Sequence, residues 1–71
     1  MPPYGPRQTS ETLDALELLI RAELVLGPRS ARELYENLPN RYAFRVVQSA
    51  LKRAQIGGRL AYDRASDSWR L

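Results

Sequence analysis

The stretch NRYAFRVVQSALKRAQIGGRLAYDRASDSWRL, residues 40–71, decides the fold, because its pattern changes from helical to strand-like at a double glycine. On a helical wheel, its first part separates a polar side from an apolar side formed by Ala43, Val46, Val47, Ala50, Leu51 and Ala54. Gly57 and Gly58 then end the helix by permitting a positive backbone φ. We therefore predict a helix over residues 40–56, with Asn40 as its N-cap, and a hairpin over residues 59–71.

The hairpin is indicated by alternating residues on either side of a turn-forming segment, residues 63–67. A four-residue loop at 64–67 brings two cross-strand pairs to one face: Tyr62 with Trp69, and Leu60 with Leu71. We expect the aromatic pair to cover the core, with Arg64 at the tip of the hairpin.

The polar side of the helix over residues 40–56 carries long side chains that donate hydrogen bonds. They are Arg41, Arg45, Gln48, Lys52 and Gln55. A helix with such a line of donors can lie in a DNA groove, because Arg pairs with guanine, Gln pairs with adenine and Lys contacts phosphate.

The charge of the chain is concentrated in its second half. Residues 1–38 carry four Arg against six acids, and residues 39–71 carry six Arg and one Lys against two Asp, so the net +3 divides into −2 and +5. Five cations and no acid lie between Arg41 and Arg59. We expect an anionic partner to bind this half, and the alternative is a solvated basic face without a ligand.

The N-terminal half is expected to hold a first helix over residues 10–26, which begins at Ser10 and ends at Gly27. Its core-facing stripe comprises Leu13, Leu16, Ile20 and Leu24. A polar face is expected to carry an ion pair between Glu17 and Arg21. The remaining positions are also apolar: Ala15, Leu18, Leu19, Ala22, Val25 and Leu26. Either this helix is central in the domain, or its second face packs against another copy of the chain.

A second, shorter helix is indicated by the capping-box pattern of Ser30 and Glu33, and Pro39 ends it. Its expected buried residues are Ala31, Leu34, Tyr35 and Leu38. The connection before it, residues 27–29, has room for at most one residue that pairs with a strand. The sequence therefore predicts a mainly α domain with a small β-hairpin.

Helix, short helix, basic helix, double glycine and terminal hairpin together resemble the winged-helix branch of the helix-turn-helix DNA-binding proteins, over residues 10–71. The resemblance rests on SARELYENL at 30–38, the following helix with Val47 and Leu51 inward, GGRL at 57–60 and YDRASDSW at 62–69. It implies a three-helix winged helix-turn-helix, with helix 40–56 in the major groove and hairpin 59–71 as the wing. The wing is short and carries Asp63 and Asp67 beside Arg64, which argues against deep insertion.

The resemblance also implies the DNA-binding residues. The groove-facing set is Arg41, Tyr42, Arg45, Gln48, Ser49 and Lys52. Arg64 becomes the wing contact, and Ser30 and Arg32 are expected to meet the DNA backbone. A homodimer through helix 10–26 would present two such helices to a palindromic site.

We therefore expect sequence-specific binding of double-stranded DNA by a small transcriptional regulator. The alternative is a winged-helix module that docks an acidic or apolar surface of another protein. Catalysis, a metal and a cofactor are not expected, because the chain lacks His, Cys and a Gly-rich phosphate loop. RNA binding has no support from an aromatic platform of the kind that stacks unpaired bases.

The 71 residues are enough for one domain with a small core. Residues 1–9 are rich in Pro and Gly, which predicts a flexible N-terminal arm. No apolar run reaches the roughly 18–20 residues of a membrane span, and the first residues lack a signal-peptide pattern. A cytoplasmic, nucleoid-associated protein is expected.

Overall fold

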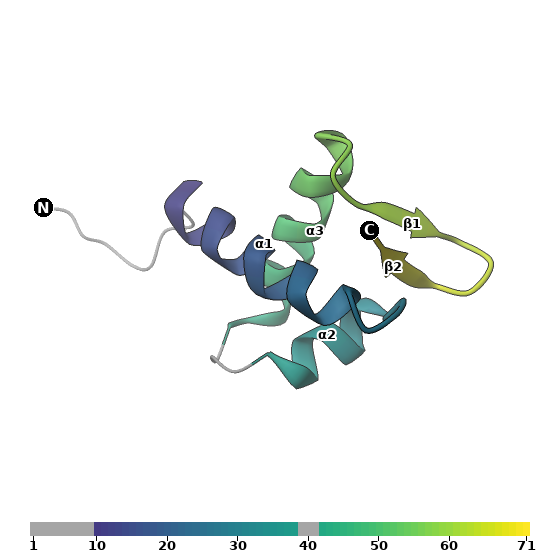
Figure 1. The fold of residues 1–71 in the computed structure, drawn as a ribbon. Helices are drawn as coiled ribbons and strands as arrows, with labels where there is room; N and C mark the ends of the chain where they lie inside the picture. Colours follow the sequence, from purple (N-terminus) through teal and green to yellow (C-terminus); the bar gives the residue numbers. More distant parts are fainter. Residues whose placement is uncertain (1–9, 39–41) are drawn as a thin grey trace, which may run out of the picture.

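The computed structural model describes residues 10–38 and 42–71, in which helices are followed by a hairpin. The elements are α1 (Ser10–Leu24), α2 (Ala31–Asn37), α3 (Phe44–Ile56), β1 (Ala61–Asp63) and β2 (Ser68–Arg70). The helices pack together, and the antiparallel hairpin projects to one side of them (Figure 1). The predicted mainly helical fold with a small hairpin is confirmed. The predicted arm at 1–9, Asn40 and Arg41 lie outside the described residues.

The core lies where α1 and α2 pack against α3. Its fully buried large side chains are Leu16, Ile20, Leu34, Val47 and Leu51. The predicted core stripe of α1 is confirmed, although Leu13 at its N-terminal end is only half-buried. None of the helices in the described part of the chain is long and apolar enough to cross a bilayer.

The capping box that starts α2 is present in full. The amide of Glu33 donates to the Ser30 hydroxyl over 3.1 Å, and the amide of Ser30 donates to the Glu33 carboxylate over 2.9 Å. The predicted burial of Tyr35 is wrong, because its side chain remains 38% exposed. Leu34 is fully buried, and the side chain of the next residue, Tyr35, lies about 100° further round the helix. The Tyr35 ring instead meets the ring of Phe44 edge to face, with centroids 5.4 Å apart.

The start of α3 differs from the prediction. The helix begins at Phe44, and its N-cap is Ala43, whose backbone is extended with φ −66° and ψ 148°. Ala43 was expected on the apolar side, yet it is exposed and provides no side-chain acceptor for the first amides. Tyr42 packs against the core just before the helix, so the chain is still extended where helix was predicted.

The register of the hairpin is the predicted one, with Tyr62 opposite Trp69 across a loop at 64–67. The two rings lie 4.9 Å apart between centroids. The expected core-facing pair of Leu60 and Leu71 is not formed as predicted. The ladder ends one residue earlier, so Leu60 is buried while Leu71 is 54% exposed.

A single bridge residue joins the helices to the hairpin. The amide of Arg29, between α1 and α2, donates to the Trp69 carbonyl over 3.1 Å, and the Trp69 amide donates back over 2.7 Å. This is the one-residue pairing for which the sequence left room. At the other end of the hairpin, Gly58 adopts the predicted positive φ of 76°, whereas Gly57 keeps a helical φ of −79°.

Candidate nucleic-acid interface

One face of α3 is exposed and polar along its whole length. It carries Arg45, Gln48, Lys52 and Gln55, all exposed, opposite the buried face that includes Val47 and Leu51. The separation of the two faces that the helical wheel predicted is therefore confirmed for these residues. Arg41, the first member of the predicted line, lies outside the described residues.

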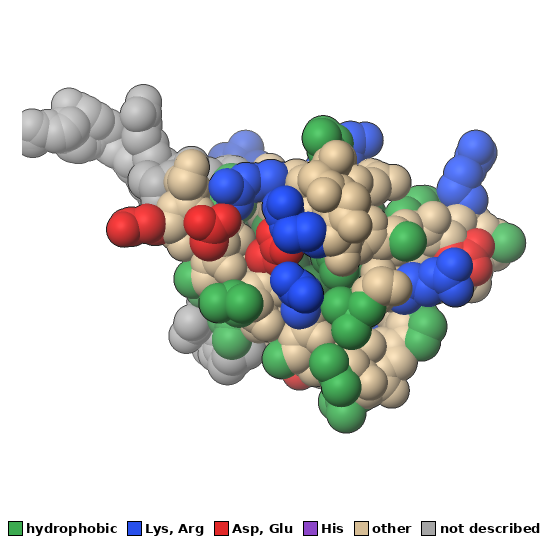
Figure 2. All heavy atoms as spheres, turned by 45° about the horizontal axis from the view of Figure 1, so that its top comes forward, with side chains coloured by type: hydrophobic (Ala, Val, Ile, Leu, Met, Phe, Trp, Pro, Cys, Tyr) green, Lys and Arg blue, Asp and Glu red, His purple; other side chains and the backbone are tan. Residues whose placement is uncertain are grey.

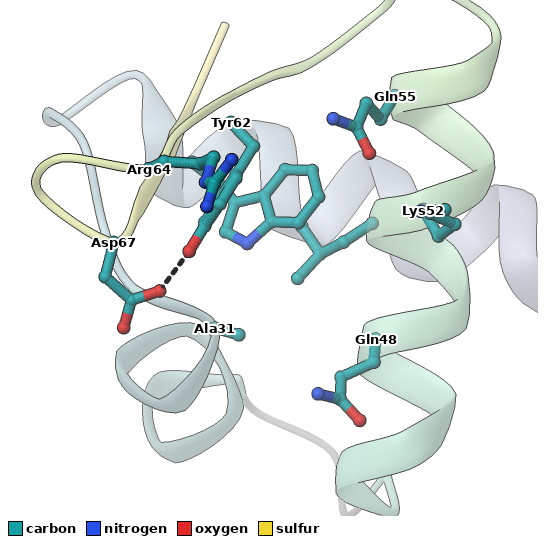
Figure 3. A pocket seen from close by; sticks show the side chains of 9 residues that line it. Ala31, Gln48, Lys52, Gln55, Tyr62, Arg64 and Asp67 are labelled. Carbon is teal, nitrogen blue, oxygen red and sulfur yellow. Dashed lines mark hydrogen bonds between the residues drawn. The ribbon is translucent and has the colours of Figure 1, made fainter.

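A groove of about 510 Å³ separates this polar face from the hairpin. Gln48, Lys52 and Gln55 lie on the α3 side, and Tyr62, Arg64 and Asp67 lie on the hairpin side (Figure 3). The side chains of Gln48 and Gln55 point from α3 toward the groove (Figure 3). The fold therefore brings α3 residues and Arg64 of the hairpin to one concave surface.

A second hollow, of about 570 Å³, lies along the other side of the same α3 face. Ser49, which is half-buried, lines it together with Arg45 and Lys52. Ile56, 77% exposed, closes its C-terminal end. The predicted residues Arg45, Gln48, Ser49 and Lys52 thus form one continuous surface on α3.

Two cations of the basic half are bound to acids of α1. Arg53 contacts the Asp14 carboxylate at 2.7 Å. The Arg59 guanidinium donates two hydrogen bonds to the Glu17 carboxylate, of 2.7 and 3.1 Å. Figure 2 shows acidic side chains among basic ones over α1 and the end of α3. Within residues 10–38 and 42–71, Arg45 and Lys52 form no ion pair, so their charge remains available on the polar face of α3.

The predicted ion pair between Glu17 and Arg21 is present, but the Glu17 side chain is buried and has a second, closer partner. Glu17 is 6% exposed, and its distance to Arg21 is 3.9 Å, so its main partner is Arg59. The hydrogen bond from Arg59 to Glu17 raises the pKa of Arg59, and desolvation offsets part of that rise. Sequence reasoning missed this contact, because the two residues are 42 positions apart.

Gly57 provides the space for that contact. A methyl group in place of its hydrogen would overlap the guanidinium of Arg59. The double glycine therefore has two roles: Gly58 supplies the positive φ, and Gly57 lets Arg59 fold back over the end of α3.

Both acids of the hairpin are held by hydrogen bonds within it. The Asp63 carboxylate accepts the Ala65 amide over 2.9 Å. Hydrogen bonds from the Ser66 side chain and from that amide lower the pKa of Asp63. The Asp67 carboxylate accepts the Tyr62 hydroxyl over 2.5 Å.

The other predicted backbone contacts lie around the start of α2. The Ser30 hydroxyl serves the capping box, and Ala31 lines the groove. The Arg32 guanidinium lies over the Phe44 ring, 5.5 Å from its centroid. Tyr42 is half-buried against the core. Three of the residues predicted to bind DNA therefore do not line the groove beside Arg64: Ser30, Arg32 and Tyr42.

The Arg59 contact yields a first prediction. Replacing Arg59 by alanine is expected to lower the melting temperature by several degrees, because it leaves a buried carboxylate with only the distant Arg21. A second change, Glu17→Leu, should restore the loss by removing the unpaired charge. The matched control is Arg53→Ala, which breaks an exposed pair and should change little. Equal losses for Arg53→Ala and Arg59→Ala, measured by circular dichroism, would contradict this account.

In the part of the chain that the structure describes, no three His, Cys, Asp or Glu side chains gather to hold a metal ion. No protein-family model matches the chain, and comparisons with curated proteins and with solved structures find no significant match.

Proposed function

We propose that this chain binds double-stranded DNA sequence-specifically, as a small transcriptional regulator of the winged-helix type. The observation that carries the proposal is the row of exposed donors on α3, whose cations Arg45 and Lys52 pair with no acid among the described residues. A helix of this width fits the major groove, and the hairpin would then lie beside it.

Each side chain on the polar face suits a different part of the duplex. Arg45 can fork onto guanine, and Gln48 and Gln55 can each form two hydrogen bonds with adenine. Lys52 is best suited to a phosphate, because its ammonium group is a point charge without a planar fork. Arg64, across the groove, can meet the phosphates that flank this contact.

We also propose that two copies bind together through the outer face of α1. Leu18, Val25 and Leu26 on or just after this helix are 67%, 71% and 72% exposed. With 15 residues, α1 offers a strip about 22 Å long and about 10 Å wide. Because a stable interface buries about 800 Å² per partner, this strip supports a weak dimer that DNA strengthens by binding both copies.

The dimer proposal predicts a loss of cooperative DNA binding for Leu18→Glu. The added carboxylate would be buried without a partner in the helix pair, so two-copy complexes should weaken while one-copy complexes remain. Sedimentation and shift assays on a two-half-site duplex measure both species. Leu71→Glu adds the same charge at an exposed Leu that is not part of α1 and is the control. Unchanged cooperativity in Leu18→Glu would remove α1 as the dimer face.

Selection of bound sequences from random duplex DNA tests the proposed function directly. We expect an enriched palindrome whose half-site centres lie about one DNA turn, or about 34 Å, apart. Enrichment of a single half-site would support DNA binding by one copy and reject the dimer. The absence of any enriched sequence would reject sequence-specific binding.

The exposed apolar face of α1 also favours a second candidate, in which the chain is a protein-interaction module. That face would then dock an apolar surface of a different protein. The two candidates differ in one measurable respect: the interaction module would bind all duplexes equally and only at low salt.

A further inference from the structure

Tyr62, Arg64 and Asp67 form a small cluster on the hairpin wall of the groove. The Tyr62 hydroxyl donates to the Asp67 carboxylate over 2.5 Å (Figure 3). Arg64 and Asp67 bracket the same tight turn, and the Asp67 amide approaches the Arg64 carbonyl at 3.4 Å. Even so, in the described part of the chain Arg64 and Asp67 form no ion pair within 4.0 Å.

The position of the Tyr62 hydroxyl is fixed by the hairpin. Tyr62 lies on β1 directly opposite Trp69, and the two rings are in contact. Trp69 is itself packed against the core and bridged to Arg29. The hydroxyl is therefore presented to Asp67 from a supported ring rather than from a free side chain.

We propose that the Tyr62 hydroxyl is a positioning group that holds Asp67 away from Arg64, and so keeps the Arg64 guanidinium available to a DNA phosphate. This inference rests on the proposed DNA-binding function. Without the hydroxyl, the Asp67 carboxylate loses its hydrogen-bond donor. It would then form an ion pair with Arg64, the cation in the same turn. The pair would cancel the positive charge that the hairpin contributes to the groove.

The local electrostatics agree with this arrangement. The hydrogen bond to Asp67 raises the pKa of the Tyr62 phenol, and the charge of Arg64 opposes that rise. Arg64 is thus close enough to act on the phenol, although it is exposed to solvent. Asp67 has a φ of 51°, a conformation that Asn also adopts readily, so Asp67→Asn removes the charge without disturbing the turn.

A double-mutant cycle tests the proposal, with Tyr62→Phe, Asp67→Asn and the double variant. Affinity for a duplex, measured by fluorescence anisotropy across salt concentrations, should fall about threefold to tenfold in Tyr62→Phe. Its salt slope should shrink by about one, the loss of one phosphate contact. In the Asp67→Asn background, Tyr62→Phe should have no effect, because no carboxylate remains to capture Arg64. Tyr35→Phe, which removes an exposed hydroxyl elsewhere, is the control.

Equal losses of affinity in both backgrounds would overturn the proposal, since Tyr62 would then contact DNA directly. A second measurement needs no DNA. The NMR signal of the Arg64 side-chain Nε–H should shift in Tyr62→Phe and return in the double variant. An unshifted signal would also overturn the inference. If the signal shifts but the wild-type protein binds no duplex, the proposed function fails while the role of Tyr62 within the hairpin stands.

Discussion

Replacing Arg45 and Lys52 together by alanine is expected to lower affinity for duplex DNA by about tenfold to a hundredfold at low salt. The dependence of log K on log salt should also flatten by about one to two units, because each phosphate contact contributes about 0.9 to that slope. Both side chains are exposed on α3, so the fold should be unaffected. Shift assays over a range of salt concentrations measure both quantities.

The size of this effect follows from which cations are available. Arg53 and Arg59 are bound to Asp14 and Glu17, so the double replacement removes both α3 cations that pair with no acid among the described residues. Arg45 also carries sequence preference if it forks onto guanine. We therefore expect the loss to be larger for a selected site than for random duplex.

A variant of equal charge separates this site from a general effect of net charge. The double variant Arg21→Ala, Arg70→Ala also removes two positive charges, one from α1 and one from β2. The Arg70 side chain lies on the opposite face of the hairpin from Trp69, because the two residues are adjacent on the strand. The affinity of this variant should change much less than that of the Arg45 and Lys52 double variant. Equal losses in the two double variants would show that no particular face of α3 binds the duplex.

Leu51→Ala should produce the largest loss of stability. Leu51 is 0% exposed at the centre of α3, and such a truncation in a core costs about 2–5 kcal/mol. At about 0.05–0.15 kcal/mol per residue, a chain of 71 residues has a total free energy of unfolding of only about 4–11 kcal/mol. The variant should therefore lose a large part of its stability and unfold well below the wild-type temperature.

Urea denaturation followed by circular dichroism measures this change as a lower midpoint at an unchanged slope. Leu71→Ala, at a Leu that is 54% exposed, removes the same atoms outside the core and is the matched control. A similar midpoint for the two variants would contradict the central place of Leu51 in the core. Because Leu51 also lines the groove, its variant should be compared for DNA binding only under conditions where it is folded.

The features that the sequence predicted well depend on neighbours along the chain. The capping box of Ser30 and Glu33 and the opposition of Tyr62 and Trp69 follow from local spacing. The errors arose where packing overrode spacing. Tyr42 packs on the core, and α3 begins only after it, at Phe44. Tyr35 on α2 meets the Phe44 ring instead of entering the core.

The sequence by itself determined which segments form helices, the hairpin register and the polar face that Arg45, Gln48 and Lys52 share, because helix and strand periodicity are local properties. It did not determine the helix ends: α1, predicted over residues 10–26, ends at Leu24, and α3, predicted over residues 40–56, begins at Phe44. Only the tertiary structure decided which charges are free. Arg53 and Arg59 meet their acids across 39 and 42 positions of the chain. Charges pair by distance in space, so the same basic residues divide into those that hold the fold together and those that remain for a partner.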